Sequence, residues 1–216
     1  VQRPHMDQWP LLRKNANIAM YRSDVSQMQI HPNHLNPPFD NVKARQALLA
    51  MVNQEEYLRA IAGEPENFRV CYSLTGCGGW LETDAGADLL KKQDFEKAKQ
   101  LLAEAGYKGE KIVVMAPSDF APINAASLTT AAMLRKSGVN VDLQVVDWGT
   151  LVSRRGVKDP PSKNPGGYHI FHTFSGAAAV KDPWGHANIS TACDKGWFGW
   201  ACSEKASKVL ANLGQL

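Results

Sequence analysis

One stretch of this chain, residues 111–146, limits its possible folds more than any other. It opens with KIVVM (111–115), a nearly continuous apolar run of the kind that is buried on both faces of a parallel sheet. A helical pattern over 122–137 follows and ends at Gly138, and VNVDLQVV (139–146) then alternates as a second strand. Strand, helix and strand with short connections predict a parallel, right-handed βαβ unit.

Further elements extend this unit on both sides. Asp147 is a candidate N-cap for a short helix over 148–154, and YHIFHTF (168–174) predicts a last strand. Upstream, loose alternation over 25–35 predicts another strand. The fold class is therefore expected to be α/β, with a mostly parallel sheet covered by flanking helices.

Two adjacent helices are expected between that first strand and the βαβ unit. Asp40 or Asn41 caps the first of them, whose apolar residues recur at helical spacing. Asn53, with Glu56 three residues later, resembles a capping box for the second helix, which Gly63 ends.

A long irregular segment follows these helices. Residues 64–93 contain several glycines and no periodic pattern, so a surface loop is expected there. Asp94 then caps a helix that ends at Gly106. Apolar residues at helical spacing over 206–213 predict a final amphipathic helix.

The four cysteines form two local pairs, Cys71 with Cys77 and Cys193 with Cys202. Zinc sites usually present closer pairs such as CxxC, so the spacing favours two short disulfide loops. Free buried thiols and metal ligation stay open as alternatives. Each disulfide would stabilise the fold by about 2–3 kcal/mol, and the pair would imply an oxidising compartment, periplasmic or extracellular.

Charge and motif content argue against several classes of function. The 24 basic and 21 acidic residues are interspersed, so no basic stripe suggests a nucleic-acid partner. The sequence contains no apolar run of roughly eighteen residues that would predict a membrane span. It also lacks the GxGxxG, P-loop, GxSxG and HExxH signatures, and no cofactor is expected.

Histidine spacing does not suggest a metal site. His169 and His172 lie three residues apart on a predicted strand, and His31 and His34 have the same spacing. Side chains three apart on a strand point to opposite faces, which is unsuitable for binding one ion. Ordinary histidines are therefore expected at these positions.

Ligands of open α/β sheets gather at the carboxyl ends of the strands. Here those ends offer aromatic and small polar residues without a nucleophile, a base and an orienting partner, which is typical of a binding cleft. Trp197, Phe198 and Trp200 form a separate aromatic group, expected to pack a turn onto the core or, alternatively, to wall a ligand site. The candidate ligand-binding residues are Ser118, Asp119, Phe120, Trp148, Phe174, Ser175 and Gly176.

The segment NPPFDNVKARQALLAMVNQEEYLRAIAG resembles the periplasmic solute-binding proteins of peptide, dipeptide and nickel ABC importers, often called family 5. An extended segment ending in a Pro-Pro-Phe turn, an Arg-containing helix and a second helix closed by Gly match that family over residues 37–63. Residues 94–109, 128–154 and 174–184 agree with it in order and spacing.

This resemblance implies a type II periplasmic-binding-protein lobe, one of two lobes that close over a ligand. The chain is accordingly expected to be a piece of a longer protein whose missing first lobe is a partner. Residues 1–36 would be the tail of the first-lobe segment and the crossover strand. Residues 37–190 would be the α/β second lobe, and residues 191–216 a disulfide turn and a C-terminal helix leading back toward the first lobe.

The resemblance also implies a function: capture of a peptide-like or other small solute in the periplasm for an ABC permease of the inner membrane, without enzymatic activity. A secreted α/β hydrolase-type domain and a periplasmic sensor-coupled receptor are the alternatives. Such a periplasmic receptor could keep Cys193–Cys202 oxidised.

Two departures from the family pattern bear on the ligand. Ala179 stands where peptide-binding relatives place an acidic residue, and Ser118 stands where dipeptide-type relatives place an arginine. A simple dipeptide is therefore not expected as the ligand, since each charge-assisted contact contributes about 1.5–3 kcal/mol. Asp119 beside Phe120 suggests a cationic or amphipathic ligand instead.

Overall fold

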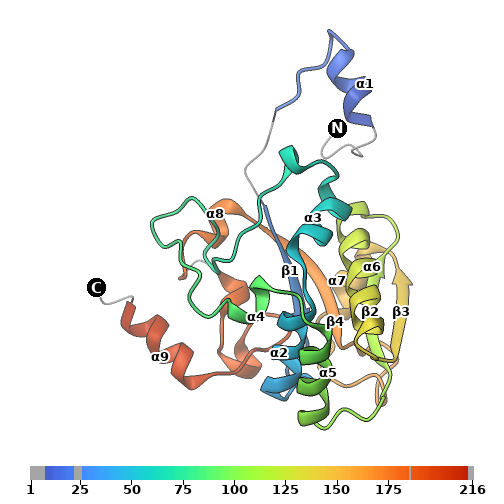
Figure 1. Ribbon diagram of the computed structural model, residues 1–216, viewed down its shortest axis with the longest axis vertical. Helices are drawn as coiled ribbons and strands as arrows, with labels where there is room; N and C mark the ends of the chain where they lie inside the picture. Colours follow the sequence, from blue (N-terminus) through green and yellow to red (C-terminus); the bar gives the residue numbers. More distant parts are fainter. Residues whose placement is uncertain (1–7, 22–25, 185, 214–216) are drawn as a thin grey trace.

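The computed structural model describes residues 8–21, 26–184 and 186–213, and the body of the molecule is built around one mixed sheet (Figure 1). The strands of this sheet are β1 (Ser26–Pro32), β2 (Ile112–Pro117), β3 (Val141–Val146) and β4 (Ile170–Gly176). They stand in the order β1-β4-β2-β3. β2 is parallel to both β3 and β4, whereas β1 is antiparallel to β4. The predicted α/β fold with a mostly parallel sheet is confirmed.

The predicted strand–helix–strand unit forms as β2, α6 (Ala121–Lys136) and β3. Every residue of β2 is buried, as its nearly continuous apolar run requires. Pro122 stands in the first turn of α6, where its missing N–H costs no hydrogen bond, and Arg135 and Lys136 stand in the last turn. Gly138 then adopts a φ of 78°, a left-handed conformation that glycine reaches without steric cost.

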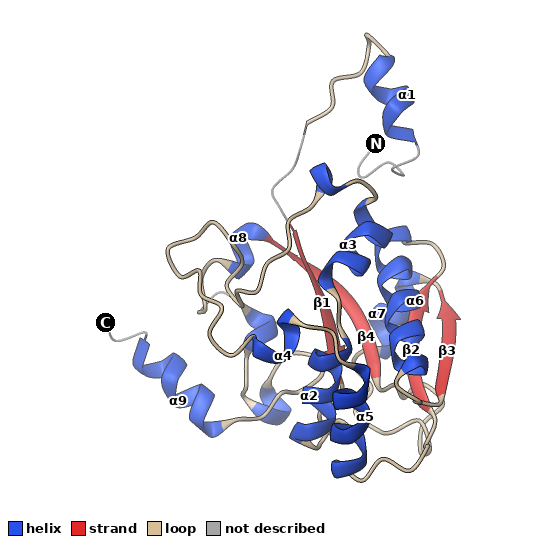
Figure 2. Cartoon of the chain, in the orientation of Figure 1, coloured by secondary structure: helices blue, strands red, loops and turns tan. Residues whose placement is uncertain are grey.

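Helices cover both faces of the sheet (Figure 2). The main ones besides α6 are α2 (Val42–Met51), α3 (Gln54–Ala62), α5 (Phe95–Glu104) and α7 (Trp148–Arg154). Ile112 and Val114 of β2 belong to a core cluster with α2, α3, α5 and α6. Val113 and Met115 point to the opposite face and cluster with Leu151 of α7. The sheet is therefore the central layer between two apolar cores.

Local capping explains where the first two of these helices begin. The side chain of Asn41 accepts the backbone N–H of Lys43 at 2.9 Å, so Asn41 and not Asp40 caps α2. Asn53 accepts the backbone N–H of Glu56 at 3.3 Å and caps α3 as predicted. Among the described contacts, the Glu56 carboxylate makes no return bond to Asn53, so the cap does not form the full capping box.

The segment 64–93 is largely irregular, as predicted, apart from the short helices η2 (Pro65–Asn67) and α4 (Asp88–Lys91). The side chain of Asp94 then accepts the backbone N–H of Lys97 at 2.8 Å and begins α5. The remaining elements are α1 (Trp9–Lys14), α8 (Ala177–Val180), η3 (Ala187–Ile189), η4 (Cys193–Lys195) and α9 (Glu204–Leu213).

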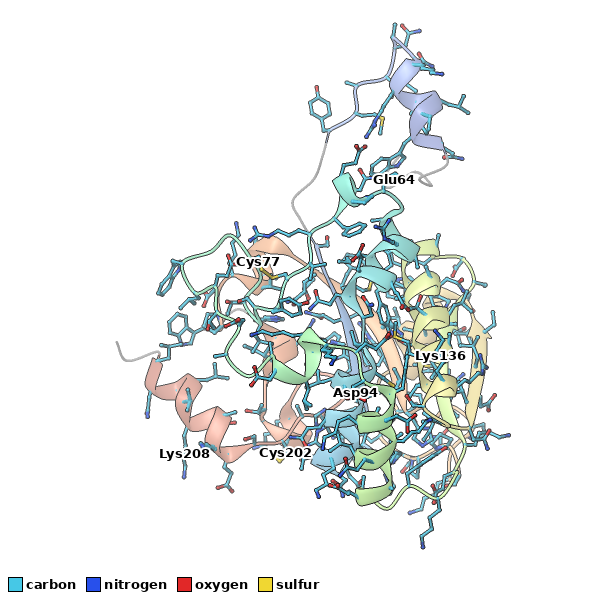
Figure 3. The ribbon with its side chains drawn as sticks, viewed as in Figure 1. Glu64, Cys77, Asp94, Lys136, Cys202 and Lys208 are labelled. Carbon is cyan, nitrogen blue, oxygen red and sulfur yellow. A yellow bond between two sulfur atoms is a disulfide. The ribbon has the colours of Figure 1, made fainter. Side chains whose placement is uncertain are left out.

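Both predicted disulfides form: Cys71 bonds to Cys77, and Cys193 bonds to Cys202. The alternative assignments of free thiols or metal ligands are therefore wrong for these four cysteines. Figure 3 labels Cys77 in the irregular segment and Cys202 close to the start of α9.

The last strand differs in its limits from the prediction of 168–174. β4 begins at Ile170 and continues to Gly176, because antiparallel β1 provides a partner for it as far as Ser26. This shift matters for the site, since it places Phe174, Ser175 and Gly176 on the strand itself.

Candidate functional site

The parallel strands β2, β3 and β4 end at one edge of the sheet, here called the carboxyl edge (Figure 2). Three predicted residues from separate segments meet there. The ring centroid of Phe120 lies 5.1 Å from that of Trp148 and 5.7 Å from that of Phe174, in edge-on geometry for both pairs. Phe120, Trp148 and Phe174, which we call the aromatic trio, present an apolar surface of the kind that lines small-ligand sites.

Ser118 and Asp119 hold the loop after β2 against the start of α7. The backbone N–H of Ser118 donates to the carbonyl of Val146 at 2.8 Å, and its hydroxyl lies 3.3 Å from the same oxygen. Oδ1 of Asp119 accepts the backbone N–H of Trp148 at 2.7 Å. One carboxylate oxygen of Asp119 is therefore committed to positioning Trp148, and the other remains at the exposed edge.

Four uncharged polar side chains form a second group, which we call the polar ladder. The antiparallel register places Gln27 of β1 opposite Ser175 of β4, and Gln29 lies two residues further along the same face. Asn188, from η3, completes the group by donating to Ser175 Oγ at 2.7 Å and to Gln29 Oε1. Gln29 Nε2 donates to Gln27 Oε1 at 2.8 Å. All four side chains are half-buried.

The end of β4 joins the two groups. Phe174 of the aromatic trio and Ser175 of the polar ladder are consecutive, so their side chains leave opposite faces of the strand. Gly176 follows, paired with Ser26, and a Cβ built on it would meet no atom within 4 Å. The carboxyl edge therefore offers an apolar surface on one face of β4, a neutral polar surface on the other, and open space beside Gly176.

The first disulfide loop borders the polar ladder. Gln27 Nε2 donates to the carbonyl of Leu74 at 3.3 Å, and Gln54 of α3 holds the backbone of Cys71 through two hydrogen bonds of 2.8 and 2.9 Å. A Cβ on Gly76 would lie 3.3 Å from Val180 Cγ2, so this loop also contacts α8. Figure 3 shows Cys77 beside α8.

Of the polar ladder residues, only Ser175 was predicted from the sequence. The alternation of Gln27, Met28 and Gln29 in the first predicted strand indicated that both glutamines share one face. Nothing local indicated that this strand pairs with β4 or that Asn188 lies over both. The hydrogen bonds of Gln29 with Ser175 and Asn188 join residues that are 146 and 159 positions apart.

The structure brings together one serine–histidine contact that sequence reasoning did not foresee. Ser127 Oγ lies 3.0 Å from His172 Nδ1, but the single hydroxyl proton donates to the carbonyl of Ile123 at 2.9 Å. His172 Nδ1 must then carry a proton and donate it to Ser127, and Nε2 accepts from Thr130 at 2.7 Å. This arrangement is the reverse of an activated nucleophile.

Burial confirms the structural role of this contact. Ser127 and His172 are both fully inaccessible, so no substrate reaches them. Burial lowers the pKa of His172 from 6.5 to about 3, and the imidazole is therefore a very weak base. Across the described residues, no three His, Cys, Asp or Glu side chains are grouped in a way that could hold a metal ion.

The aromatic group of the second disulfide loop lies elsewhere. The ring centroid of Trp197 is 4.7 Å from that of His31 and 5.8 Å from that of Phe171, where β1 ends and β4 begins. Trp200 is buried, and the guanidinium of Arg155 covers the Phe198 ring at 4.5 Å. These rings pack the loop onto the sheet at the edge opposite the aromatic trio and do not wall the candidate site.

Two hollows on the surface are also distinct from the carboxyl edge. One, of about 440 Å³, lies between the turn at Pro38 and the end of α5 near Tyr107. The other, of about 620 Å³, lies beside α9 and is lined by Trp184, His186 and Trp197 among others. Neither contains a residue of the aromatic trio, and Asn188 of the polar ladder is outside both.

Comparison with known proteins identifies the family. The model for bacterial extracellular solute-binding proteins, family 5 (middle), matches residues 1–191. The probable peptide ABC transporter periplasmic-binding protein y4tO of Sinorhizobium fredii is 41% identical over 213 residues, which are 97% of this chain and 40% of that protein. The glutathione-binding protein GsiB of Escherichia coli is 26% identical over 183 residues, which are 82% of this chain and 34% of that protein.

Solved structures show the same fold. DppA of Helicobacter pylori, in complex with the peptide STSA, aligns with a TM-score of 0.74 at 19% identity, over 99% of this chain and 40% of that one. NikA of Staphylococcus aureus, in complex with Ni(L-His)2, aligns with a TM-score of 0.72 at 16% identity, over 97% of this chain and 43% of that one. The predicted type II periplasmic-binding-protein lobe is confirmed.

The chain spans between 34% and 40% of the length of these two curated relatives. Within the described ranges, no helix combines the length and the apolar character needed to cross a membrane. The family match covers most of the sequence, in agreement with the resemblance found at residues 37–63. The chain therefore belongs to the bacterial extracellular solute-binding proteins of family 5.

Proposed function

We propose that this chain is one lobe of a periplasmic substrate-binding protein, and that the whole protein captures a peptide-like solute for an ABC importer. The Sinorhizobium relative is named a probable peptide ABC transporter periplasmic-binding protein, which supports this assignment. The two disulfides support an oxidising compartment, since such bonds persist in the periplasm. The inner-membrane permease of the importer is the proposed partner.

The observation that carries the proposal is the contact of Phe120 with both Trp148 and Phe174 at the carboxyl edge. These rings come from three segments, and open α/β sheets bind their ligands at such an edge. The mechanism is capture by closure of two lobes, in which the aromatic trio forms one wall of the cleft and the first lobe the other.

We further propose that this lobe has no enzymatic activity. The described serine–histidine contact, Ser127 with His172, is fully buried, and its proton arrangement opposes nucleophilic attack. At the carboxyl edge, the hydroxyls of Ser118 and Ser175 have no histidine within their described hydrogen bonds. The hydrolase alternative therefore gains no support from the site.

The proposed division of the chain follows from this assignment. Residues 37–190 form the second lobe, and β1, within residues 1–36, is the crossover strand that enters its sheet. Residues 191–216 lead back toward the first lobe. The positions of α1 and α9, which project from the body at two different sides, support this division (Figure 1).

The test uses the full-length receptor, purified from periplasm without denaturation and examined by native mass spectrometry. We expect a bound mass that fragments as a peptide or peptide-like solute. Phe120→Ala should lower the retained fraction at least tenfold by removing the centre of the aromatic trio. Phe95→Ala is the matched control, because it removes a half-buried ring of α5 that packs against the core cluster of α2, α3, α5 and α6, away from the aromatic trio. Equal retention by both variants would refute the proposed site.

A further inference from the structure

Every hydrogen bond within the polar ladder has a defined direction. Gln29 Oε1 is a carbonyl oxygen with no proton, so Asn188 Nδ2, Ser175 Oγ and His31 Nε2 all donate to it. His31 therefore carries its proton on Nε2. Three donors saturate the two lone pairs of this oxygen, and Gln29 Oε1 has no capacity left for a ligand.

The hydrogen-bonding groups that remain unused on the ladder are uncharged and include both donors and an acceptor. Gln27 and Gln29 each have two N–H groups on Nε2, and each donates one of them, to Leu74 O and to Gln27 Oε1 respectively. Asn188 uses its two N–H groups on Ser175 and Gln29, while its Oδ1 accepts no bond among the described contacts. The spare N–H donors and the spare carbonyl acceptor thus belong to side chains that are linked by hydrogen bonds.

Among the described residues, no Lys, Arg, Asp or Glu side chain makes a hydrogen bond to a ladder residue. The ion pairs of the described residues involve Lys43, Arg59, Arg69, Lys91 and Lys99, none of which contacts a ladder residue in the described hydrogen bonds. The carboxylate of Asp119 is engaged by Trp148 on the other side of the site. A charged ligand end placed on the ladder would lose hydration without gaining a counter-ion from the side chains that bond to the ladder in the described part of the chain, which disfavours it.

We infer that the polar ladder binds uncharged peptide units of the ligand, so that this lobe contacts internal amides of a peptide-like solute and neither of its charged ends. A peptide unit offers one N–H donor and one carbonyl acceptor without charge, which matches the spare acceptor of Asn188 and the spare donors of Gln27 and Gln29. The inference rests on the proposed function and specifies its ligand class.

The test compares two forms of one ligand pool on the full-length receptor. A random tetrapeptide pool with free ends and the same pool with acetylated N-termini and amidated C-termini are supplied together in equal amounts. Native mass spectrometry then reports the ratio of the two forms retained. We expect this ratio to lie within threefold of unity. A more than tenfold preference for free ends would overturn the inference while leaving peptide capture intact.

If the receptor retained neither pool and were also empty as purified, both the proposed function and the inference would be wrong.

Two substitutions test whether the ladder itself contacts the peptide. Asn188→Ala should lower retention of both pools about tenfold, and Asn188→Asp should create a preference of at least tenfold for peptides with a free amino end. Thermal unfolding of each variant checks that it is folded. Wild-type retention and an unchanged ratio in both folded variants would show that the ladder does not touch the ligand.

Ser175→Ala serves as a second variant, because it is a small change at a half-buried position of β4. It removes the hydroxyl that receives one N–H of Asn188 and should lower retention of both pools to a smaller extent, about threefold. Full retention by Ser175→Ala together with full retention by Asn188→Ala would overturn the assignment of this surface to the ligand.

Discussion

Asp119 accepts the backbone N–H of Trp148 at 2.7 Å, and this bond ties the loop after β2 to the first residue of α7. The two residues are 29 positions apart, so the contact is a property of the tertiary fold. Asp119 can therefore act in two ways: it can hold Trp148 in the aromatic trio, or its charge can attract a cationic ligand.

Substitutions at Asp119 distinguish these roles in the full-length receptor. Asp119→Asn retains an Oδ1 acceptor for the Trp148 N–H and removes the charge, whereas Asp119→Ala removes both. If the residue acts by positioning Trp148, the asparagine variant should bind ligand within about twofold of wild type, and the alanine variant should lose about three- to tenfold in affinity by titration calorimetry. Equal losses in both variants would instead show that the charge contacts the ligand.

Because two of its histidines are buried, the protein should lose free energy of unfolding in mild acid. Burial lowers the pKa of His172 to about 3 and that of His169 to about 4, both from 6.5. Below pH 6.5 the unfolded chain takes up protons at these positions and the folded chain does not, so the free energy of unfolding should decrease as pH falls from about 6.5 toward these values. The largest slope is about 1.4 kcal/mol per pH unit for each histidine.

Urea unfolding at several values between pH 7.5 and pH 5 measures this slope, above the range in which carboxylates titrate. His172→Gln keeps a polar side chain and cannot gain a proton. It should be less stable than wild type at pH 7 and lose less stability on acidification. A slope unchanged by this substitution would contradict the prediction.

Ser127 is predicted to be structural. Ser127→Ala removes the acceptor of the His172 Nδ1–H and the donor to Ile123 O in a fully buried site, which should lower the free energy of unfolding by about 1–3 kcal/mol. Ligand affinity should be unchanged. Hydrolysis of an activated ester by the wild-type receptor that disappears in this variant would restore the hydrolase alternative.

The first disulfide should stabilise both the fold and the border of the polar ladder. Cys71→Ser with Cys77→Ser frees the loop that receives the hydrogen bond of Gln27, and should cost about 2–3 kcal/mol in the free energy of unfolding. Alkylation of the wild-type protein without reductant should leave its mass unchanged. Addition of four alkyl groups under these conditions would show that the cysteines are free.

Much of the fold was predictable because its signals are local. The apolar run of β2, the helical spacing in α6 and the capping by Asn53 and Asp94 involve residues a few positions apart, and each was confirmed. The disulfide pairs were predictable for the same reason, since Cys71 and Cys77 are separated by six positions and Cys193 and Cys202 by nine.

The candidate site was only partly predictable. The rule that ligands gather at the carboxyl ends of parallel strands selected Phe120, Trp148 and Phe174, and the structure places their rings in contact. It did not select Gln27 or Gln29, because both precede the parallel strands and reach the same edge only through antiparallel pairing of β1 with β4.

The sequence by itself determined the kinds of element, their order and the aromatic part of the site, which depend on short-range spacing and composition, and its motifs carried the resemblance to the family. Only the tertiary structure decided that Asn188 bonds to Gln29 across 159 positions and that Asp119 serves Trp148. The physical reason is that strand register and loop docking are chosen by burial of the whole core, so a hydrogen bond between distant side chains has no local signal in the chain.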